Sequence, residues 1–242
     1  MRPACALAAK VLNEVAAFIK PGVTTRDIDN LAAEVIRANG AKSAFLGYRK
    51  FPRHTCISVN DEVVHGMGSE REVKFGDIVS LDVGVSYRGF IGDTAKTVAV
   101  GGCSVAAQRL MDVTEKALYQ GIAAALAGNR VSDISRAVQE YVESNNFSVV
   151  REFVGHGVGR TMHEEPQIPN FVDRNSNQKL RSGMTLAIEP MVNAGSANVK
   201  ILKDGWTVVT QDGSLSAHFE HTVLITDKGP EILTWPENRS FA

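Results

Sequence analysis

"VSLDVGVSYRGFIGDTAKTV", residues 79–98, has the alternating apolar pattern of a buried β-hairpin, yet it carries two aspartates. Asp82 and Asp93 stand where this pattern favours valine. A carboxylate removed from water without a partner costs several kcal/mol. The chain must therefore expose these two acids, pair them, or provide a cation.

A short internal repeat relates this hairpin to the second half of the chain. "KFGDIVSLDVG" and "RSGMTLAIEPM" each have a basic residue, a glycine two positions later, and an acid six residues after that glycine. Another acid follows downstream in each half, which gives the set Asp82, Asp93, Glu189 and Glu220. Two such halves packed face to face would bring four carboxylates to one centre, where divalent metal would neutralise them.

A histidine-containing segment, "GHGVGRTMHEEP" at residues 155–166, supplies imidazole for such a centre. His156 lies between two glycines, whose backbone freedom would let the ring lean into a site, and His163 follows seven residues later. Gln167 replaces the second histidine of HExxH, so a zincin helix is excluded. Four acids with one imidazole suit Mn, Fe(II), Co or Zn, and a pair of such ions implies hydrolysis.

Composition narrows the class of protein. The 242 residues can bury one large core, and 26 Lys plus Arg against 27 Asp plus Glu create no field that would favour nucleic acid or a membrane surface. The three cysteines form no CxxC, which favours a reducing cytoplasm. No run approaches the ~18 to 20 apolar residues of a membrane span.

Periodicity predicts an α/β protein with paired helices. We expect one helix up to "KPG" at 20–22, and a second in "TTRDIDNLAAEVIRANG" with its threonines as cap candidates and Asn39-Gly40 as the C-cap. A third is expected to be capped by Ser104 and to reach about 127, and a fourth to be capped by Ser132 and to end near Asn145. Strands are expected in "TCISV", "EVVHG", the opening hairpin, "FSVV", "MTLAIEPMV", "GWTVVTQD" and "EHTVLIT". With no linker, residues 1–242 are predicted to form a single domain with halves of about 1–103 and 104–242.

Five ordered blocks, "CISVNDEVVHGM", "DIVSLDVGVSYRGFIGDTAKT", "GHGVGRTMHEEP", "GMTLAIEPM" and "FEHTVLIT", resemble the signature of type I methionine aminopeptidases. The resemblance covers nearly the whole chain. It implies the α/β pita-bread fold, in which two pseudo-symmetric halves form a curved antiparallel sheet covered by helices. Only 31 positions separate Glu189 from Glu220, which leaves no room for the helical insertion of type II enzymes.

The resemblance also implies a metal centre and a reaction. Two divalent ions (Co, Mn, Fe(II), Zn or Ni) would be held by Asp82, Asp93, His156, Glu189 and Glu220, with Asp93 and Glu220 bridging both ions. A metal-activated hydroxide would attack the carbonyl of an N-terminal methionine that precedes a small residue. His65 would contact the substrate, His163 would donate to the carbonyl oxygen, and Glu189 would carry the proton to the leaving amine.

The implied methionine pocket has apolar walls. It is expected to contain Tyr48, Phe51, Cys56 and Trp206, with Phe45 and Met162 nearby. Many relatives have a small cysteine in place of Phe45 and an aromatic residue in place of Met162, so this chain's pocket should differ in shape. The implied partners are N-termini of nascent polypeptides at the ribosome in the cytoplasm, and the implied state is a monomer that binds neither nucleic acid nor membrane.

Alternatives remain at this stage. Asp82 and Asp93 could be turn acids that reach solvent, His65, His156 and His163 could be ordinary loop histidines, and Tyr48, Phe51 and Trp206 could be core. Cys56 is expected to be a packed thiol, and Glu164 and Glu165 a solvated acidic pair. A proline-directed aminopeptidase or dipeptidase of the same fold, or a non-catalytic binding protein, would also account for parts of the pattern.

Overall fold

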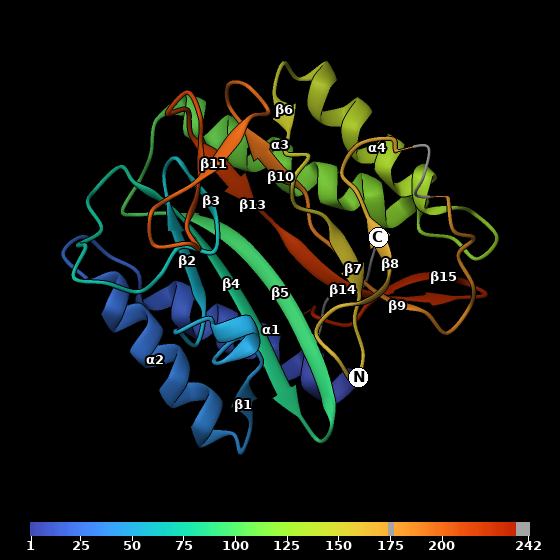
Figure 1. Ribbon diagram of the computed structural model, residues 1–242, viewed down its shortest axis with the longest axis horizontal. Helices are drawn as coiled ribbons and strands as arrows, with labels where there is room; N and C mark the ends of the chain where they lie inside the picture. Colours follow the sequence, from blue (N-terminus) through green and yellow to red (C-terminus); the bar gives the residue numbers. More distant parts are fainter. Residues whose placement is uncertain (174–176, 236–242) are drawn as a thin grey trace.

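The computed structural model describes residues 1–173 and 177–235, and its centre is a nine-stranded antiparallel sheet (Figure 1). The sheet has the order β1 (Lys42–Ser43), β4 (Ile78–Tyr87), β5 (Phe90–Ala99), β14 (Glu220–Thr226), β9 (Thr185–Ile188), β7 (Gly155–Gly157) and β8 (Glu164–Ile168), with β2 (Cys56–Val59) on β4 and β15 (Gly229–Ile232) on β14. One smaller sheet joins β13 (Ser216–His218), β10 (Met191–Asn193) and β6 (Ser148–Val149). The other joins β11 (Val199–Ile201), β12 (Val208–Thr210) and β3 (Glu62–Val64), and a short 3-10 turn η1 (Tyr48–Lys50) precedes β2.

Two pairs of helices cover the sheet. In Figure 1, α1 (Arg2–Phe18) and α2 (Thr25–Ala38) lie together beside β4, whereas α3 (Val105–Ala124) and α4 (Val131–Ser144) lie together on the other half of the molecule. Each pair buries its own apolar cluster against the sheet. The helices α1 and α2 thus pack in one apolar cluster, and α3 and α4 pack in another.

The helix caps show where local prediction succeeded. Thr24 caps α2 by accepting from the amide of Asp27, and Ser104 caps α3 by accepting from the amide of Ala107. The prediction for Ser132 was wrong, because α4 begins at Val131 and the Asp133 carboxylate accepts from the Arg130 amide. Asp133, at the third helical position, therefore caps the start of α4 in place of Ser132.

The internal repeat is also a repeat of backbone contacts. Gly76 and Gly183 have φ of 95° and 94°, and each is the second residue of a turn that leads into a central strand. The Gly76 amide donates to the Val100 carbonyl, and the Gly183 amide donates to the Ile225 carbonyl. Both positions need the left-handed conformation that glycine adopts without strain.

The hairpin quoted above is formed by β4 and β5. Tyr87 pairs with Phe90, so Arg88 and Gly89 form a two-residue turn, and their φ angles of 52° and 79° are those of a type I′ turn. In this register Asp82 pairs with Ala95 and Gly84 pairs with Asp93. Because paired residues point to the same side of a sheet, both carboxylates lie on one face.

Two glycines allow close packing on the two faces of this hairpin. A Cβ atom at Gly92 would lie 2.5 Å from the Ala4 carbonyl oxygen, so α1 packs directly on β5. On the acidic face, a Cβ atom at Gly84 would lie 2.5 Å from the ring of Phe45. The second glycine therefore makes room for an aromatic side chain beside the acids.

Some strand predictions need correction. The single strand expected over "MTLAIEPMV" is two strands, β9 and β10, separated at Glu189-Pro190. The expected glycine-rich loop around His156 is strand β7, and "FSVV" forms only the short β6. Strands β1, β8, β11, β13 and β15 were not predicted, because segments of two to five residues show too little periodicity.

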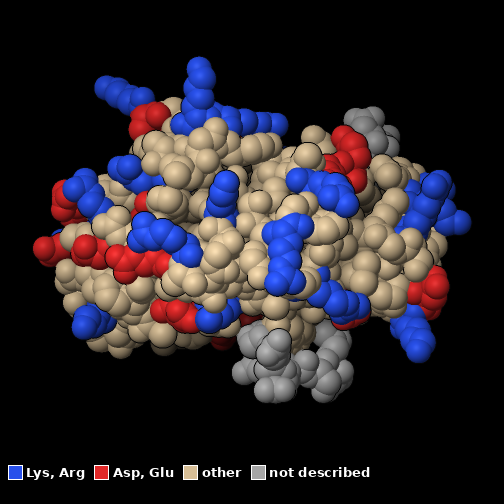
Figure 2. All heavy atoms as spheres, turned by 90° about the horizontal axis from the view of Figure 1, so that it is seen from below, with Lys and Arg blue, Asp and Glu red and all other residues tan. Residues whose placement is uncertain are grey.

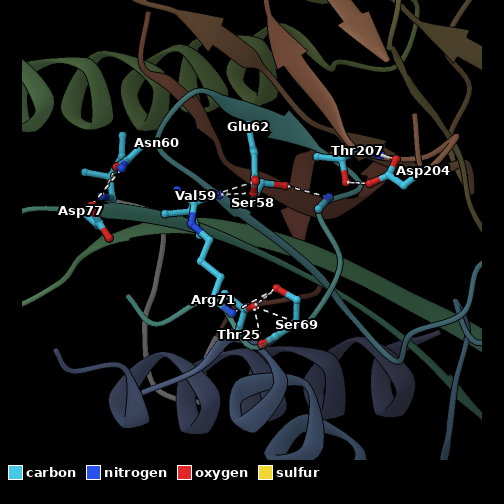
Figure 3. A network of polar contacts seen from close by, with 12 residues as sticks. Thr25, Ser58, Val59, Asn60, Glu62, Ser69, Arg71, Asp77, Asp204 and Thr207 are labelled. Carbon is cyan, nitrogen blue, oxygen red and sulfur yellow. Dashed lines mark hydrogen bonds and ion pairs between the residues drawn. The ribbon is translucent and has the colours of Figure 1, made fainter. Parts of the chain in front are cut away.

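A polar network holds the segment from β2 to the start of β4 (Figure 3). The Asn60 amide donates to Asp77, and the Val59 amide donates to the Glu62 carboxylate, which also pairs with Arg71 at 2.7 Å. Ser69 and Thr25 exchange hydrogen bonds, which ties the segment to α2. The loop that carries His65 is thereby fixed between two rigid elements.

The surface agrees with the nearly neutral composition. In the face shown in Figure 2, basic and acidic side chains are both present across the surface. Among the described residues, no helix has the length and apolar character needed to cross a membrane.

Candidate metal centre

The strand register brings the predicted acids to one face of the central sheet. Glu220 pairs with Ala95, which in turn pairs with Asp82, so these residues form a row across β14, β5 and β4. Asp93 is the diagonal neighbour of this row. On the other side of β14, His156 pairs with Ala187, two positions before Glu189. Three strands of the second half thus complete a site that starts on the hairpin of the first.

The side chains converge. The Nε2 atom of His156 lies 3.7 Å from Oδ2 of Asp93 and 3.5 Å from Oε1 of Glu189. Asp93, His156 and Glu220 each offer one ligand atom, and these three atoms lie within 4.8 Å of one another. Asp93 and Glu220 are 2% exposed and His156 is 5% exposed, so the alternative of turn acids that reach solvent does not hold for Asp93.

The ring of His156 is oriented by its own backbone neighbour. Its Nδ1 atom lies 2.8 Å from the Gly157 carbonyl oxygen, and a carbonyl can only accept, so Nδ1 carries the proton. The lone pair of Nε2 then faces the carboxylates, as a metal-ligating histidine requires. The flanking glycines serve close strand packing, since a Cβ atom at Gly155 or Gly157 would lie 2.4 Å from a carbonyl oxygen of β9 or β8. Glycine is therefore needed on both sides of His156 for close strand packing, and not for the backbone freedom that we expected.

The buried polar atoms test whether a cation fits. Among the described residues, the buried side-chain N and O atoms that have no hydrogen-bond partner are Asp82 Oδ1, Asp93 Oδ1, His218 Nε2 and Glu220 Oε1. All four belong to residues that line one cavity. Buried oxygens normally have partners, and carboxylates with one imidazole are the donors that divalent first-row metals accept. The residues present therefore fit a divalent metal.

Burial shifts the pKa values of the acids and of His156. Burial raises the pKa of Asp82 to about 7 and that of Glu189 to about 8, and for Asp82 the charge of Glu189 adds to the shift. Burial and the neighbouring carboxylates raise the pKa values of Asp93 and Glu220 well above their usual range. Burial lowers the pKa of His156 to about 4. The imidazole is therefore neutral and able to bind metal, while the carboxyl groups need a cation to be ionised together.

The cavity has a volume of about 340 Å³. Its apolar part contains the residues expected for a methionine pocket. Its lining includes Phe45, Tyr48, Phe51, Cys56, Met162 and Trp206. Phe51 and Trp206 meet edge to face at 5.1 Å between ring centroids. Burial, reinforced by Asp82, raises the pKa of the Cys56 thiol well above its usual range, which agrees with a packed thiol.

His65 and His163 line the same cavity from different sides. His65 has a φ of 59°, a conformation uncommon for residues other than glycine, and its ring meets that of Phe153 edge to face. Burial lowers the pKa of His65 to about 4. His163 stacks on Tyr48, whose hydroxyl lies 2.7 Å from its Nδ1 atom, and its ring centroid lies 4.2 Å from that of His156.

Sequence analysis missed one residue at this site and underestimated a second residue beside it. His218 is 2% exposed, and its Nε2 atom lies 3.6 Å from Oε2 of Glu189. It precedes Glu220 by two positions, so strand alternation could have placed it on the same face. Glu164 is not merely part of a solvated acidic pair, because its carboxylate accepts from the amides of Arg160 and Thr161 and closes the loop that carries His163.

Comparison with known proteins agrees with this geometry. The model of metallopeptidase family M24 matches residues 1–227. A methionine aminopeptidase of Clostridium perfringens is 51% identical over 234 residues, which covers 97% of this chain and 94% of that protein. The crystal structure of methionine aminopeptidase from Rickettsia prowazekii superposes with a TM-score of 0.94 at 41% identity and covers 97% of this chain and 95% of that chain.

The chain belongs to metallopeptidase family M24, among the methionine aminopeptidases.

Comparison with solved structures also identifies the fold of this chain as that of the M24 family. A prolidase from Pyrococcus furiosus superposes with a TM-score of 0.78 at 23% identity, a level that supports the fold alone. The curved antiparallel sheet with its helices is thus the pita-bread fold expected from the sequence. The chain spans 63% of that prolidase, but 95% of the Rickettsia enzyme.

Proposed function

We propose that this M24 metallopeptidase removes N-terminal methionine from peptides and nascent proteins, preferentially where the second residue is small. The observation that carries the proposal is the cavity in which a buried set of acids and one imidazole adjoins an apolar aromatic pocket. Such a cavity can hold a metal beside an unbranched thioether side chain.

Two divalent ions would be held by the acids of both halves and by Nε2 of His156. The proposed ligands are Asp82, Asp93, His156, Glu189 and Glu220. When bound, Co, Mn, Fe(II), Zn or Ni would supply Lewis acidity for the scissile carbonyl and lower the pKa of a water molecule. Two features support this assignment: the neutral imidazole has a lone pair available on Nε2, and the buried acids cannot be ionised together without a cation.

The protein's own groups would orient the substrate and move protons. The pocket of Tyr48, Phe51, Cys56 and Trp206 would exclude water around the methionine side chain. His163 would donate to the carbonyl oxygen as negative charge develops there, and His65 would contact the substrate near the scissile amide. Glu189 would pass a proton to the leaving amine.

Chelation tests the dependence on metal. We expect exhaustive dialysis against a chelator to abolish hydrolysis of Met-Ala-Ser, and we expect Mn, Co or Fe(II) to restore it, because the acids cannot remain ionised together without a cation. Liquid chromatography of the released methionine measures the outcome. Full activity in a preparation shown by elemental analysis to be free of metal would refute the metal-dependent mechanism.

Substrate comparison separates this activity from that of other members of the fold. We expect Met-Ala-Ser to be cleaved and Ala-Pro peptides to be left intact, because the pocket is apolar and lies beside the acids. The opposite preference would indicate a proline-directed peptidase, and binding of both peptides without cleavage would indicate a non-catalytic protein. Action on nascent chains at the ribosome, a cytoplasmic location and a monomeric state are part of the same proposal.

A further inference from the structure

The side chain of Tyr48 lines the apolar pocket and also makes a polar contact through its hydroxyl. It lies 2.7 Å from Nδ1 of His163, and the two rings stack with their centroids 5.3 Å apart. The contact joins residues 115 positions apart, from the turn η1 and from the loop closed by Glu164. A wall that served only to surround methionine would not need this hydrogen bond.

The chain holds Tyr48 in place at the expense of backbone strain. Arg49 and Lys50, which follow it, have φ of 48° and 73°, a region that residues other than glycine rarely adopt. The turn is closed by hydrogen bonds from the Gly47 amide to the Phe51 carbonyl and from the Phe51 amide to the Tyr48 carbonyl, both 2.8 Å. Strained residues of this kind concentrate at functional sites, where the surrounding structure enforces them.

The donor of the hydrogen bond follows from the chemistry of the two groups. A phenol hydroxyl is a stronger donor than an imidazole N–H group, and an unprotonated imidazole nitrogen is a stronger acceptor than a phenol oxygen. The guanidinium of Arg49 lies 5.4 Å from the centroid of the Tyr48 ring. A cation at this position makes the phenol a better donor and a poorer acceptor. The hydroxyl therefore donates to Nδ1, which leaves the proton of His163 on Nε2.

We infer that Tyr48 is a positioning residue that holds His163 in the Nε2–H tautomer and fixes the orientation of its ring. The edge of the ring opposite Tyr48 then presents an N–H group in the cavity that contains the acids. In the reverse tautomer this edge would present a lone pair, which would repel a carbonyl oxygen. The inference rests on the proposed function for its effect on catalysis, but the tautomer is a property of the protein itself.

Nitrogen-15 NMR of histidine-labelled protein loaded with diamagnetic zinc tests the tautomer directly, with the His163 signals assigned from a His163→Asn variant. We expect a protonated Nε2 and an unprotonated, hydrogen-bonded Nδ1 in the unsubstituted protein. In Tyr48→Phe, which keeps the stacked ring, we expect the Nδ1 signal to move to the position of a nitrogen without a hydrogen bond. A protonated Nδ1 in the unsubstituted protein would overturn the inference.

Kinetics with Met-Ala-Ser test the consequence. We expect Tyr48→Phe to lower kcat about tenfold, less than the loss of an entire oxyanion donor, and to change KM less than about threefold. In a His163→Ala background the same substitution should change kcat less than about twofold, because the hydroxyl acts only through that ring. An equal loss in both backgrounds would show that Tyr48 acts on the pocket instead.

Tyr87→Phe is the matched control. It also removes a hydroxyl from a tyrosine beneath an arginine, since Arg88 lies 5.0 Å from the Tyr87 ring, but Tyr87 lies outside the cavity. Its kcat and unfolding temperature should not change. If the unsubstituted enzyme fails to cleave Met-Ala-Ser, the proposed function fails, and the NMR result alone then decides whether Tyr48 sets the tautomer.

Discussion

At the scale of single residues, the centre combines groups that destabilise one another. Asp93 is buried beside other acids, and Oδ1 has no hydrogen-bond partner among the described residues. Such a carboxyl group is retained at a cost in stability, which a bound cation would offset. Metal affinity and stability should therefore respond in opposite directions when its charge is removed.

Asp93→Asn tests this relation. We expect the affinity for Mn to fall at least about 100-fold, because loss of even an outer partner of a ligand costs about 10- to 100-fold. The metal-free protein should gain about 1 kcal/mol or more in unfolding free energy, because burial and the charges of Asp82 and Glu189 disfavour the ionised form that Asp93 has in the unfolded chain. Isothermal titration calorimetry and urea unfolding measure the two effects.

Asp29→Asn provides the control for burial alone. Asp29 is 5% exposed, but its carboxylate accepts from the amides of His54 and Thr55 and lies outside the metal-site cavity. This variant should keep the affinity for Mn while changing stability. Unaltered Mn binding by Asp93→Asn would contradict its proposed role as a ligand.

At the scale of elements, the turn between β4 and β5 fixes which face the acids share. A type I′ turn requires positive φ at both central residues, for which Asn-Gly is the preferred pair. Arg88 has a φ of 52°, a left-handed conformation that is unfavourable for arginine. The turn thus pays a local cost for the register that brings Asp82 and Asp93 together.

Opposite substitutions in the turn should have opposite effects. Arg88→Asn should raise the unfolding free energy by about 0.5 to 1 kcal/mol, because asparagine tolerates the left-handed conformation. Gly89→Ala should lower it by about 1 to 2 kcal/mol at a φ of 79°. Urea unfolding of both variants measures these changes. Destabilisation by both would show that contacts of the Arg88 side chain outweigh the backbone preference.

Sequence predicted the long elements and the acids, and failed where tertiary contacts decide. The alternation around Asp82, the caps at Thr24 and Ser104 and the turn glycines are local signals, and these predictions are confirmed. The break at Glu189-Pro190 and the strand character of His156 depend on neighbouring strands. His218 has one local signal, its position two residues before Glu220, but only the contact with Glu189 shows that it lies at the site.

At the scale of the whole molecule, the centre joins the two halves. Asp82 and Asp93 come from β4 and β5, whereas His156, Glu189 and Glu220 come from or adjoin strands of the second half. Each half has its own apolar core. A bound cation would hold the halves together, so its effect on stability should be large and dependent on pH.

Between pH 6.5 and 8 the metal-free and metal-loaded proteins should diverge. Carboxyl groups with raised pKa values, Asp82 at about 7 and Glu189 at about 8, bind more protons in the folded than in the unfolded state, so the metal-free protein loses stability as pH rises through these values. Metal binding displaces these protons and therefore strengthens with pH. The increase in unfolding temperature on adding Mn should accordingly grow from pH 6.5 to 8.

Scanning calorimetry with Mn or with chelator measures the difference. The lower limit of the pH range avoids the buried histidines, because His65 and His156, with pKa values of about 4, destabilise the fold only as pH falls below the usual value of about 6.5. An increment that is constant or shrinks over this range would contradict the coupling between the acids and the cation.

The pairing of β5 with β14 also has a consequence for biosynthesis. Asp93 and Glu220 are separated by 127 positions in the chain, although they lie in adjoining strands. Closing a loop of this length has a cost in chain entropy, and Glu220 is synthesised only after the whole intervening segment. A nascent copy of this protein therefore carries both acids of the hairpin before its second half can supply the other proposed metal ligands.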